Sequence, residues 1–355
     1  MTAVRPETGT ATVSARAAWP WWQRVDVTSA SMALGVAVVG FVVLVVLNGN
    51  YTGLVVTTGI GYAVVTVGMV VQIGYSHQLA FSQSVFMGLG AYGGALLETR
   101  YNQGVLVSMV AVIVGSVVVA YLIGAVVTRA PGLALALATL LLPLFLYELI
   151  TYSSYLGTFA GISGVLPLWS AGTYTEGMVR TGIVAVLILA VVVWLAMRIM
   201  RSGVGLQLMA LAANERLAES MGVNLRRRRL GVFIFGSVLA ALGGAIVASA
   251  QGIVTPDLVN ESAEITLLIM VFVPGRRNVI AAIIGAVVVE WLSTSTQFIS
   301  TNLPTFEGAL LVIVLLVEPD GIVGLCQRGW EAVRRKHGER AIAADRATAA
   351  KEGSA

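Results

Sequence analysis

The sequence has little charge and lacks the reactive residue clusters of metal sites. Only 11% of the 355 residues are charged, whereas a soluble domain has about a quarter. The single cysteine, Cys326, has no partner, which excludes an internal disulfide and a thiolate metal site. His77 is the only histidine in the apolar part of the chain, and it lacks the companions of a metal ligand set. We therefore expect the chain to bind no metal and no cofactor.

Lysine and catalytic motifs are scarce as well. The only lysines, Lys336 and Lys351, lie in the C-terminal tail, so the G-x-x-x-x-G-K-[ST] loop that cradles nucleotide phosphates cannot form. H-E-x-x-H, G-x-S-x-G and spaced carboxylate clusters are missing too, so we expect no enzyme. The net charge is +4, but its arginines are scattered between apolar runs without interleaved aromatics, which argues against a nucleic-acid partner.

Apolar residues are abundant instead. They make up 57% of the chain, and the mean hydropathy is +0.87. A helix that crosses the hydrocarbon core of a bilayer needs about 20 mostly apolar residues, and such stretches recur along the sequence. They predict an all-α, polytopic membrane protein with about ten transmembrane helices, some short or broken. The expected spans are 32–47, 54–73, 85–97, 105–128, 133–150, 183–200, 230–250, 265–273, 279–299 and 305–317. The third and eighth are too short to cross alone.

Arginine positions predict the orientation of these spans, because basic residues gather in cytoplasmic loops. If both termini are cytoplasmic, only Arg100 and Arg180 fall outside. We therefore expect a cytoplasmic tail over 1–29, a transmembrane domain over 30–325 and a second cytoplasmic tail over 326–355. No cleavable signal peptide is expected. The acidic stretch 255–264, which includes Glu264, would then be an outer loop.

One cytoplasmic segment, 202–225, is predicted to be a short amphipathic helix. Its sequence begins SGVGLQLMALAANERLAESMGVN, in which apolar residues recur every three or four positions. Asn214, Glu215 and Glu219 fall on another face, and Gly222 can end the helix. The segment is too short and too polar to cross the membrane. It must lie along the surface or dock into a partner.

This segment resembles the coupling loop of permeases from branched-chain amino-acid ABC importers, the LivM type. The residues that match the family pattern are Met209, Ala213, Asn214, Glu215, Ala218 and Gly222. Three further stretches are similar to the same family, at 75–97, 157–165 and 318–325, so the resemblance covers about residues 30–325. The sequence departs from the family pattern at 273–279, where it reads VPGRRNV, and at Asp320, where a basic residue is usual.

The resemblance implies the function and the partners. It implies the permease subunit of an importer in a prokaryotic plasma membrane, for branched-chain or related amino acids or small amides. It also implies a LivH-type second permease, two cytoplasmic ATPases that hydrolyse the ATP, and an extracytoplasmic solute-binding protein. The coupling residues, to which we add Glu219, would then contact an ATPase. An ion-coupled secondary transporter of small solutes is the alternative, and an intramembrane enzyme lacks its reactive residues.

Polar residues near the third span are candidates for a translocation path. The polar group consists of Ser76, His77, Gln78, Ser82, Gln83 and Ser84. It could form a broken helix against a water-filled cavity or an ordinary cytoplasmic loop. Glu290 lies within the ninth span, where a carboxylate should face the bundle interior or water. It could line the path or make a structural hydrogen bond.

Overall fold

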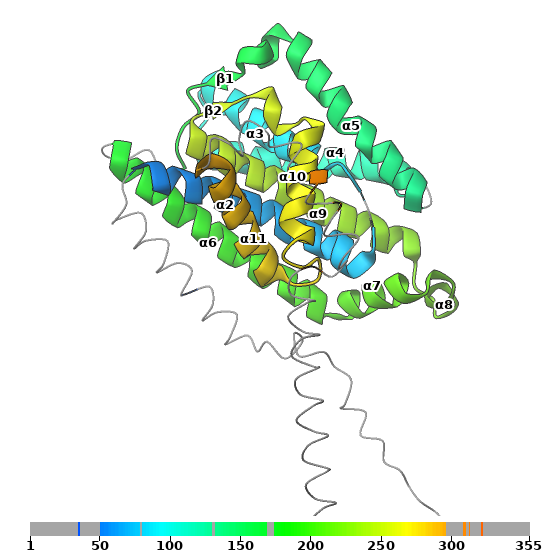
Figure 1. The fold of residues 1–355 in the computed structure, drawn as a ribbon. Helices are drawn as coiled ribbons and strands as arrows, with labels where there is room; N and C mark the ends of the chain where they lie inside the picture. Colours follow the sequence, from blue (N-terminus) through cyan, green and yellow to red (C-terminus); the bar gives the residue numbers. More distant parts are fainter. Residues whose placement is uncertain are drawn as a thin grey trace, which may run out of the picture.

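The computed structural model describes residues 50–78, 80–129, 132–168 and 174–295, together with five single positions at 35, 308, 309, 312 and 321. Helices dominate this part of the chain (Figure 1). The longer ones are α2 (Asn50–Met69), α3 (Gln83–Thr99), α4 (Val105–Val127), α5 (Gly132–Tyr152), α6 (Tyr174–Arg201), α7 (Gly203–Ala213), α9 (Leu225–Gln251), α10 (Glu261–Phe272) and α11 (Val279–Ser295). The short elements are η2 (Val70–Tyr75), η3 (Ser154–Leu156), η4 (Thr158–Ala160), β1 (Ile162–Ser163), α8 (Glu215–Ser220), β2 (Ile253–Val254) and η5 (Pro256–Leu258).

Five helical segments of the described ranges are long and apolar enough to cross a membrane. They are Gly53–Tyr75, Val105–Val127, Ala134–Tyr152, Arg180–Arg201 and Leu225–Gln251. They confirm the prediction of an all-α, multi-pass membrane protein. The count of about ten spans stays a prediction, because the expected first and tenth spans fall almost wholly outside the described residues. So do both predicted tails.

The core of the bundle is built around α2 and α9, which lie at its centre in Figure 1. Glycines allow this close packing, because they bring no side chain between the helices. A Cβ on Gly90 of α3 would lie 1.8 Å from the carbonyl oxygen of Ala241 on α9, and one on Gly244 of α9 would lie 1.9 Å from that of Met87. The backbones of α3 and α9 therefore meet directly.

Helices α4, α5 and α6 cover the bundle and expose large apolar side chains, as expected of a surface that faces lipid. Examples are Leu106 and Val126 on α4, Phe145 on α5 and Val191 on α6, all of which are more than half exposed. Helix α5 lies at the edge of the bundle in Figure 1 and contains Pro143 in its interior.

Two helices are short, as the sequence predicted. Helix α3 has 17 residues, and it gains two residues at each end over the expected span. Helix α10 has 12 residues, which at 1.5 Å per residue gives about 18 Å, too short for a hydrocarbon core of about 30 Å.

The loop after α5 is tied to the segment after α9 by two short antiparallel strands. Ile162 of β1 pairs with Val254 of β2, and the loop also binds α3, since the carboxylate of Glu98 accepts the backbone N–H of Leu166 at 3.0 Å. Gly161, with φ +71°, precedes β1, and a Cβ there would lie 2.0 Å from the carbonyl oxygen of Val254. Only glycine fits this position, because it combines left-handed backbone with a backbone contact.

Candidate functional site

The helical structure is interrupted between η2 and α3, and polar side chains are buried at this interruption. The last turn of the α2–η2 helix is closed by Gln72, whose carbonyl accepts the Ser76 hydroxyl at 2.5 Å and the Gln78 backbone N–H at 3.2 Å. His77 adopts a positive φ of 49°, which ends the helix there. Between His77 and Ser82, the residues that the structure describes are not helical. The helix is therefore interrupted here, and the role of these residues in a translocation path stays a prediction.

The two glutamines on either side of the break are joined. The Gln83 side-chain amide donates to the Gln72 side-chain oxygen at 2.5 Å, and both residues are buried. Gly236 of α9 makes room for this pair, since a Cβ there would lie 2.7 Å from Gln72 Oε1. The central helix thus packs directly against the glutamine pair.

Glu264 completes this group, although the sequence placed it in an outer loop. That prediction is wrong: Glu264 lies in the first turn of α10, is 1% exposed, and accepts the backbone N–H of Ser84 at 2.8 Å. A carboxylate suits the N-terminus of a helix, where backbone N–H groups lack helical partners. Ser82, the N-cap of α3, makes no side-chain cap bond, and Glu264 supplies an acceptor from another helix. The signal that could have revealed this is Asn260, whose side chain caps α10 by accepting from Ala263 N–H.

We call Gln72, Gln78, Ser82, Gln83, Ser84 and Glu264 the polar cluster. All six side chains are buried, and each has at least one buried polar atom without a hydrogen-bond partner among the described residues. Such atoms each cost about 1–3 kcal/mol when left unpaired. A group of this size is typical of a region that takes up water or a polar solute in a membrane protein. The unpaired atoms are Gln72 Nε2, Gln78 Nε2 and Oε1, Ser82 Oγ, Gln83 Oε1, Ser84 Oγ and Glu264 Oε1.

Two predicted path residues lie apart from the polar cluster. His77 is exposed, and its ring Nε2 lies 3.1 Å from a guanidinium nitrogen of Arg277. Glu290 is partly buried on α11, one turn beyond Val287, which contacts Gly59 of α2. Gly59 and Gln72 are separated by about 20 Å along the helix axis at 1.5 Å per residue. The predicted path roles of His77 and Glu290 stay predictions.

The segment 202–225 forms two helices where the sequence predicted one. The break falls at Asn214, which is the C-cap of α7 and the N-cap of α8, where its side chain accepts the Leu217 backbone N–H at 3.2 Å. Asparagine favours caps over helix interiors because its side chain competes for backbone bonds. Gly222, with φ +80°, ends α8 as predicted: Val223 N–H reaches the Ala218 carbonyl, a Schellman closure.

The expected apolar face of this segment points away from the bundle. Leu206, Leu217 and Met221 are 55%, 59% and 73% exposed, whereas Leu208 and Ala218 are buried. Among the other predicted coupling residues, Met209 is half-buried, and the rest are exposed: Ala213, Asn214, Glu215, Glu219 and Gly222. Glu215 forms an ion pair with Arg229 of α9. The segment therefore presents an apolar surface outward, and the Glu215–Arg229 ion pair links it to α9.

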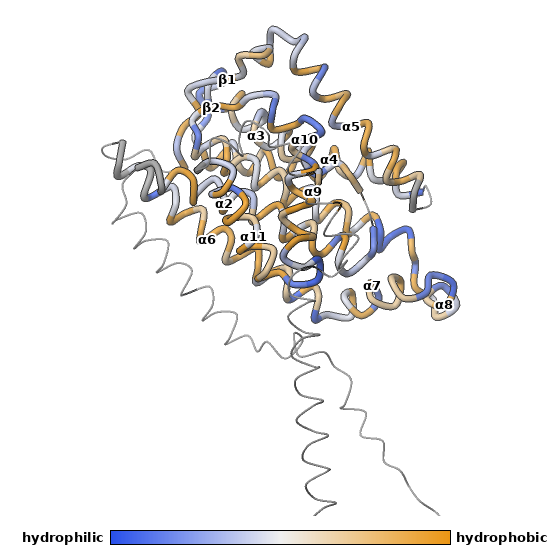
Figure 2. Tube along the Cα trace, in the orientation of Figure 1, coloured by the Kyte–Doolittle hydropathy of each residue, from blue (hydrophilic) through white to orange (hydrophobic). Residues whose placement is uncertain are grey.

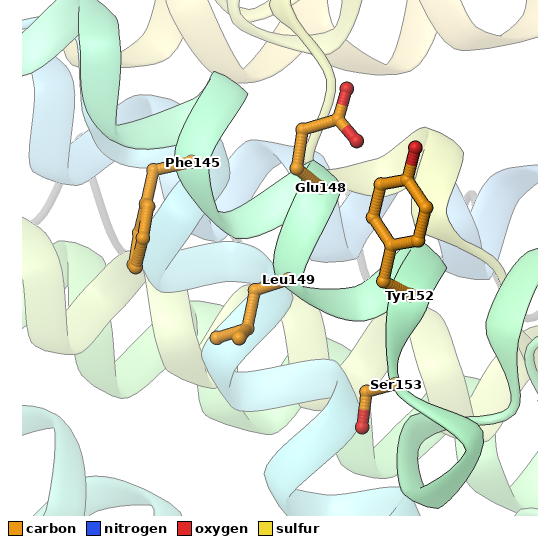
Figure 3. Close-up of a pocket in the computed structure, with 5 residues that line it drawn as sticks. All are labelled: Phe145, Glu148, Leu149, Tyr152 and Ser153. Atoms are coloured by element: carbon orange, nitrogen blue, oxygen red, sulfur yellow. The ribbon is translucent and has the colours of Figure 1, made fainter.

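A separate hollow of about 340 Å³ lies at the far end of α5 (Figure 3). Its lining residues belong to α5 and to the residue that follows it: Phe145, Glu148, Leu149, Tyr152 and Ser153. Because one helix forms its whole wall, the hollow is open on its other side.

Comparisons with known proteins agree with this architecture. A family model described as the permease component of the branched-chain amino acid transport system matches residues 50–317. The high-affinity branched-chain amino acid transport system permease protein LivM of Escherichia coli K12 is 23% identical over 286 residues, which cover 74% of this chain and 67% of LivM. LivM of Salmonella typhimurium LT2 matches to the same extent.

The corresponding LivH protein of Escherichia coli K12 is 24% identical over 290 residues, which cover 76% of this chain and 93% of LivH. No solved structure matches the chain. The family match spans well over half of the sequence and includes both the polar cluster and the segment 202–225. The chain therefore belongs to the permease components of the branched-chain amino acid transport system.

Proposed function

We propose that this permease is the membrane-spanning subunit of an ATP-driven ABC importer in a prokaryotic plasma membrane. Its substrates would be branched-chain amino acids, related amino acids or small amides. The relatives LivM and LivH, both named for branched-chain amino acid transport, support this substrate class. The family match gives no support to the alternative of an ion-coupled secondary transporter.

The proposed assembly contains a LivH-type second permease, two cytoplasmic ATPase subunits and an extracytoplasmic solute-binding protein. ATP would be hydrolysed on the ATPases, in keeping with a chain that has no P-loop lysine in its apolar region. Both termini would be cytoplasmic. This orientation is supported by the positive-inside rule, since Arg129, Arg226 and Arg229 line one pocket with α8, whereas Arg100 contacts Tyr155 in the loop after α5.

The observation that carries the proposal is the outward apolar face of α7 and α8. Exposed Leu206, Leu217 and Met221 on a segment held against the bundle by Leu208 and Ala218 are suited to a partner that buries them. We infer that an ATPase subunit docks here and moves α8. The Glu215–Arg229 ion pair would pass this movement to α9.

The polar cluster would line the translocation path. Helix α9 contacts it through Gly236, so a displacement of α9 changes the packing around the two glutamines. Glu264 holds the start of α10 against the start of α3. Movement of these helix ends relative to each other would expose the unpaired polar atoms to water on alternate sides.

The test uses the complete transporter reconstituted in liposomes, with ATP hydrolysis and uptake of radiolabelled leucine measured together. Charge reversal by Glu215→Arg should lower the uptake obtained per ATP hydrolysed, and so should Glu219→Arg. Adding Arg229→Glu to the first variant restores an ion pair of opposite polarity and should recover part of the coupling. Arg198→Glu, an exposed change on α6 near Trp194, controls for charge reversal. Wild-type coupling in Glu215→Arg and Glu219→Arg would contradict the proposal.

A further inference from the structure

A pocket of about 580 Å³ lies beside α8, where α4 ends and α9 begins. Its charged wall is formed by Arg129, Arg226 and Arg229 together with Glu215 and Glu219, and Thr128 contributes at the end of α4. Glu215 and Arg229 neutralise each other in an ion pair. The remaining charges in the pocket are the guanidinium groups of Arg129 and Arg226 and the carboxylate of Glu219. Arg129 and Arg226 form no ion pair with the described residues.

The start of α9 adds to the positive potential of the pocket. Asn224, Leu225 and Arg226 line the pocket and belong to the N-terminal turn of a 27-residue helix, whose dipole favours an anion there. The next residues, Arg227 and Arg228, extend the basic run. The pocket thus combines bidentate donors with a helix N-terminus, an arrangement that suits a phosphate group.

The exposed apolar surface of α4 ends beside this pocket. Helix α4 exposes Leu122 and Val126, at 62% and 69%, and its apolar surface ends one turn later at Thr128 and Arg129. Acyl chains that lie against Leu122 and Val126 therefore bring their headgroup to the level of Arg129. The adjoining apolar surface thus favours a lipid headgroup, whose acyl chains it can also contact, over a free anion.

We infer that this pocket binds the phosphate group of an anionic phospholipid, with its acyl chains along α4. Arg129 and Arg226 contact the phosphate, and the first turn of α9 faces it. Basic residues at a membrane surface each add about 1 kcal/mol of attraction to anionic lipid, which corresponds to about a fivefold change in affinity. The inference depends on the membrane-embedded bundle, and not on the direction or substrate of transport.

The test uses the full chain, purified in a neutral detergent, and follows its thermal unfolding during titration with phosphatidylglycerol or phosphatidylcholine. Phosphatidylglycerol should raise the unfolding temperature at lower concentration than phosphatidylcholine. Arg129→Gln and Arg226→Gln should each shift the phosphatidylglycerol midpoint about fivefold upward. Arg227→Gln is the matched control, because it removes the same charge from the same helix turn outside the pocket lining.

Four outcomes would overturn the inference. An equal response to both lipids would exclude selection of an anionic headgroup, and an equal loss in Arg227→Gln would show diffuse attraction without a site. The same stabilisation by inorganic phosphate alone would assign the pocket to a free anion. If Arg129→Gln and Arg226→Gln instead weaken only the binding of the ATPase subunits, the pocket is a protein contact.

Discussion

The carboxylate of Glu264 accepts the backbone N–H of Ser84 at 2.8 Å, across 180 positions of sequence. Glu264 lies in the first turn of α10 and Ser84 in the first turn of α3, so one carboxylate faces the positive ends of two helix dipoles. Helix α10 has 12 residues, too few to cross the hydrocarbon core alone. This buried contact therefore helps to fix α10 against α3.

Removal of the Glu264 side chain should destabilise the chain. Glu264→Ala leaves the Ser84 N–H buried without an acceptor, for an expected loss of about 1–3 kcal/mol. Glu264→Gln keeps an acceptor oxygen and should lose less. Glu261→Ala, in the same helix turn but exposed, should change stability by less than about 1 kcal/mol. Thermal unfolding in detergent ranks the three variants, and equal losses in Glu264→Ala and Glu261→Ala would refute a buried capping role.

Alanine substitutions at two glycines of α3 should have different effects on the stability of the chain. A methyl group on Gly90 would meet the Ala241 backbone at 1.8 Å, whereas one on Gly94 would have nothing within 4 Å. Gly90→Ala should therefore cost about 1–3 kcal/mol through displacement of α3 from α9. Gly94→Ala should be neutral or stabilising by up to about 1 kcal/mol, because alanine is the better helix former.

Thermal unfolding of both variants in one detergent provides the comparison. Equal unfolding temperatures for Gly90→Ala and the wild-type chain would show that α3 and α9 are not in backbone contact in the membrane protein.

The loop that carries β1 offers a similar comparison. Gly161 has a positive φ, and a Cβ there would lie 2.0 Å from the Val254 carbonyl oxygen. Gly164 also has a positive φ of +84°, but a Cβ there would have nothing within 4 Å. Gly164→Ala should cost about 1 kcal/mol from backbone strain alone, and Gly161→Ala should also separate β1 from β2. Hydrogen exchange at Ile162 and Val254 should then accelerate only in Gly161→Ala. Unchanged protection there would argue against the strand pair.

Substitutions of two leucines in the segment 202–225 should distinguish a loss of partner docking from a loss of folding stability. Leu208 is fully buried and Leu217 is 59% exposed, so Leu208→Ala should destabilise the chain by about 2–5 kcal/mol. Leu217→Ala should leave the unfolding temperature unchanged and weaken binding of the ATPase subunits, by about 1 kcal/mol or more. Copurification from membranes measures the second effect. Full retention of the ATPases by Leu217→Ala would contradict docking on this face.

Hydropathy alone predicted the membrane class, the long spans and the two short ones, because apolar runs of fixed length follow from bilayer thickness. Helical periodicity also predicted the apolar face of 202–225. It could not tell which face meets the bundle, since an exposed Leu217 and a buried Leu208 look alike in sequence. The bend at Asn214 was missed because the apolar pattern continues across it, whereas capping decides where a helix stops.

The polar cluster was predicted only in part. Local polarity identified Gln78, Ser82, Gln83 and Ser84, which are close in sequence. They are buried in a bundle whose long helices are mostly apolar (Figure 2). Gln72 was hidden inside an apolar run, and Glu264 joins the group only through tertiary packing. Glu290 was predicted to join them because carboxylates within a membrane span are rare and often functional. Its position relative to the polar cluster, however, depends on how α11 packs on α2.

Helix α5 has a property that follows from Pro143. Proline has no backbone N–H, so the carbonyl of Thr139, four residues earlier, loses its usual helical partner. Thr139 is also where α5 is fastened to the segment beside the polar cluster, since its hydroxyl oxygen accepts the Phe81 backbone N–H at 2.8 Å. The half of α5 that precedes the proline is thus anchored, while the half that carries Phe145 and Tyr152 follows a weakened turn. The two halves of α5 are therefore joined by one backbone hydrogen bond fewer than a continuous helix would have.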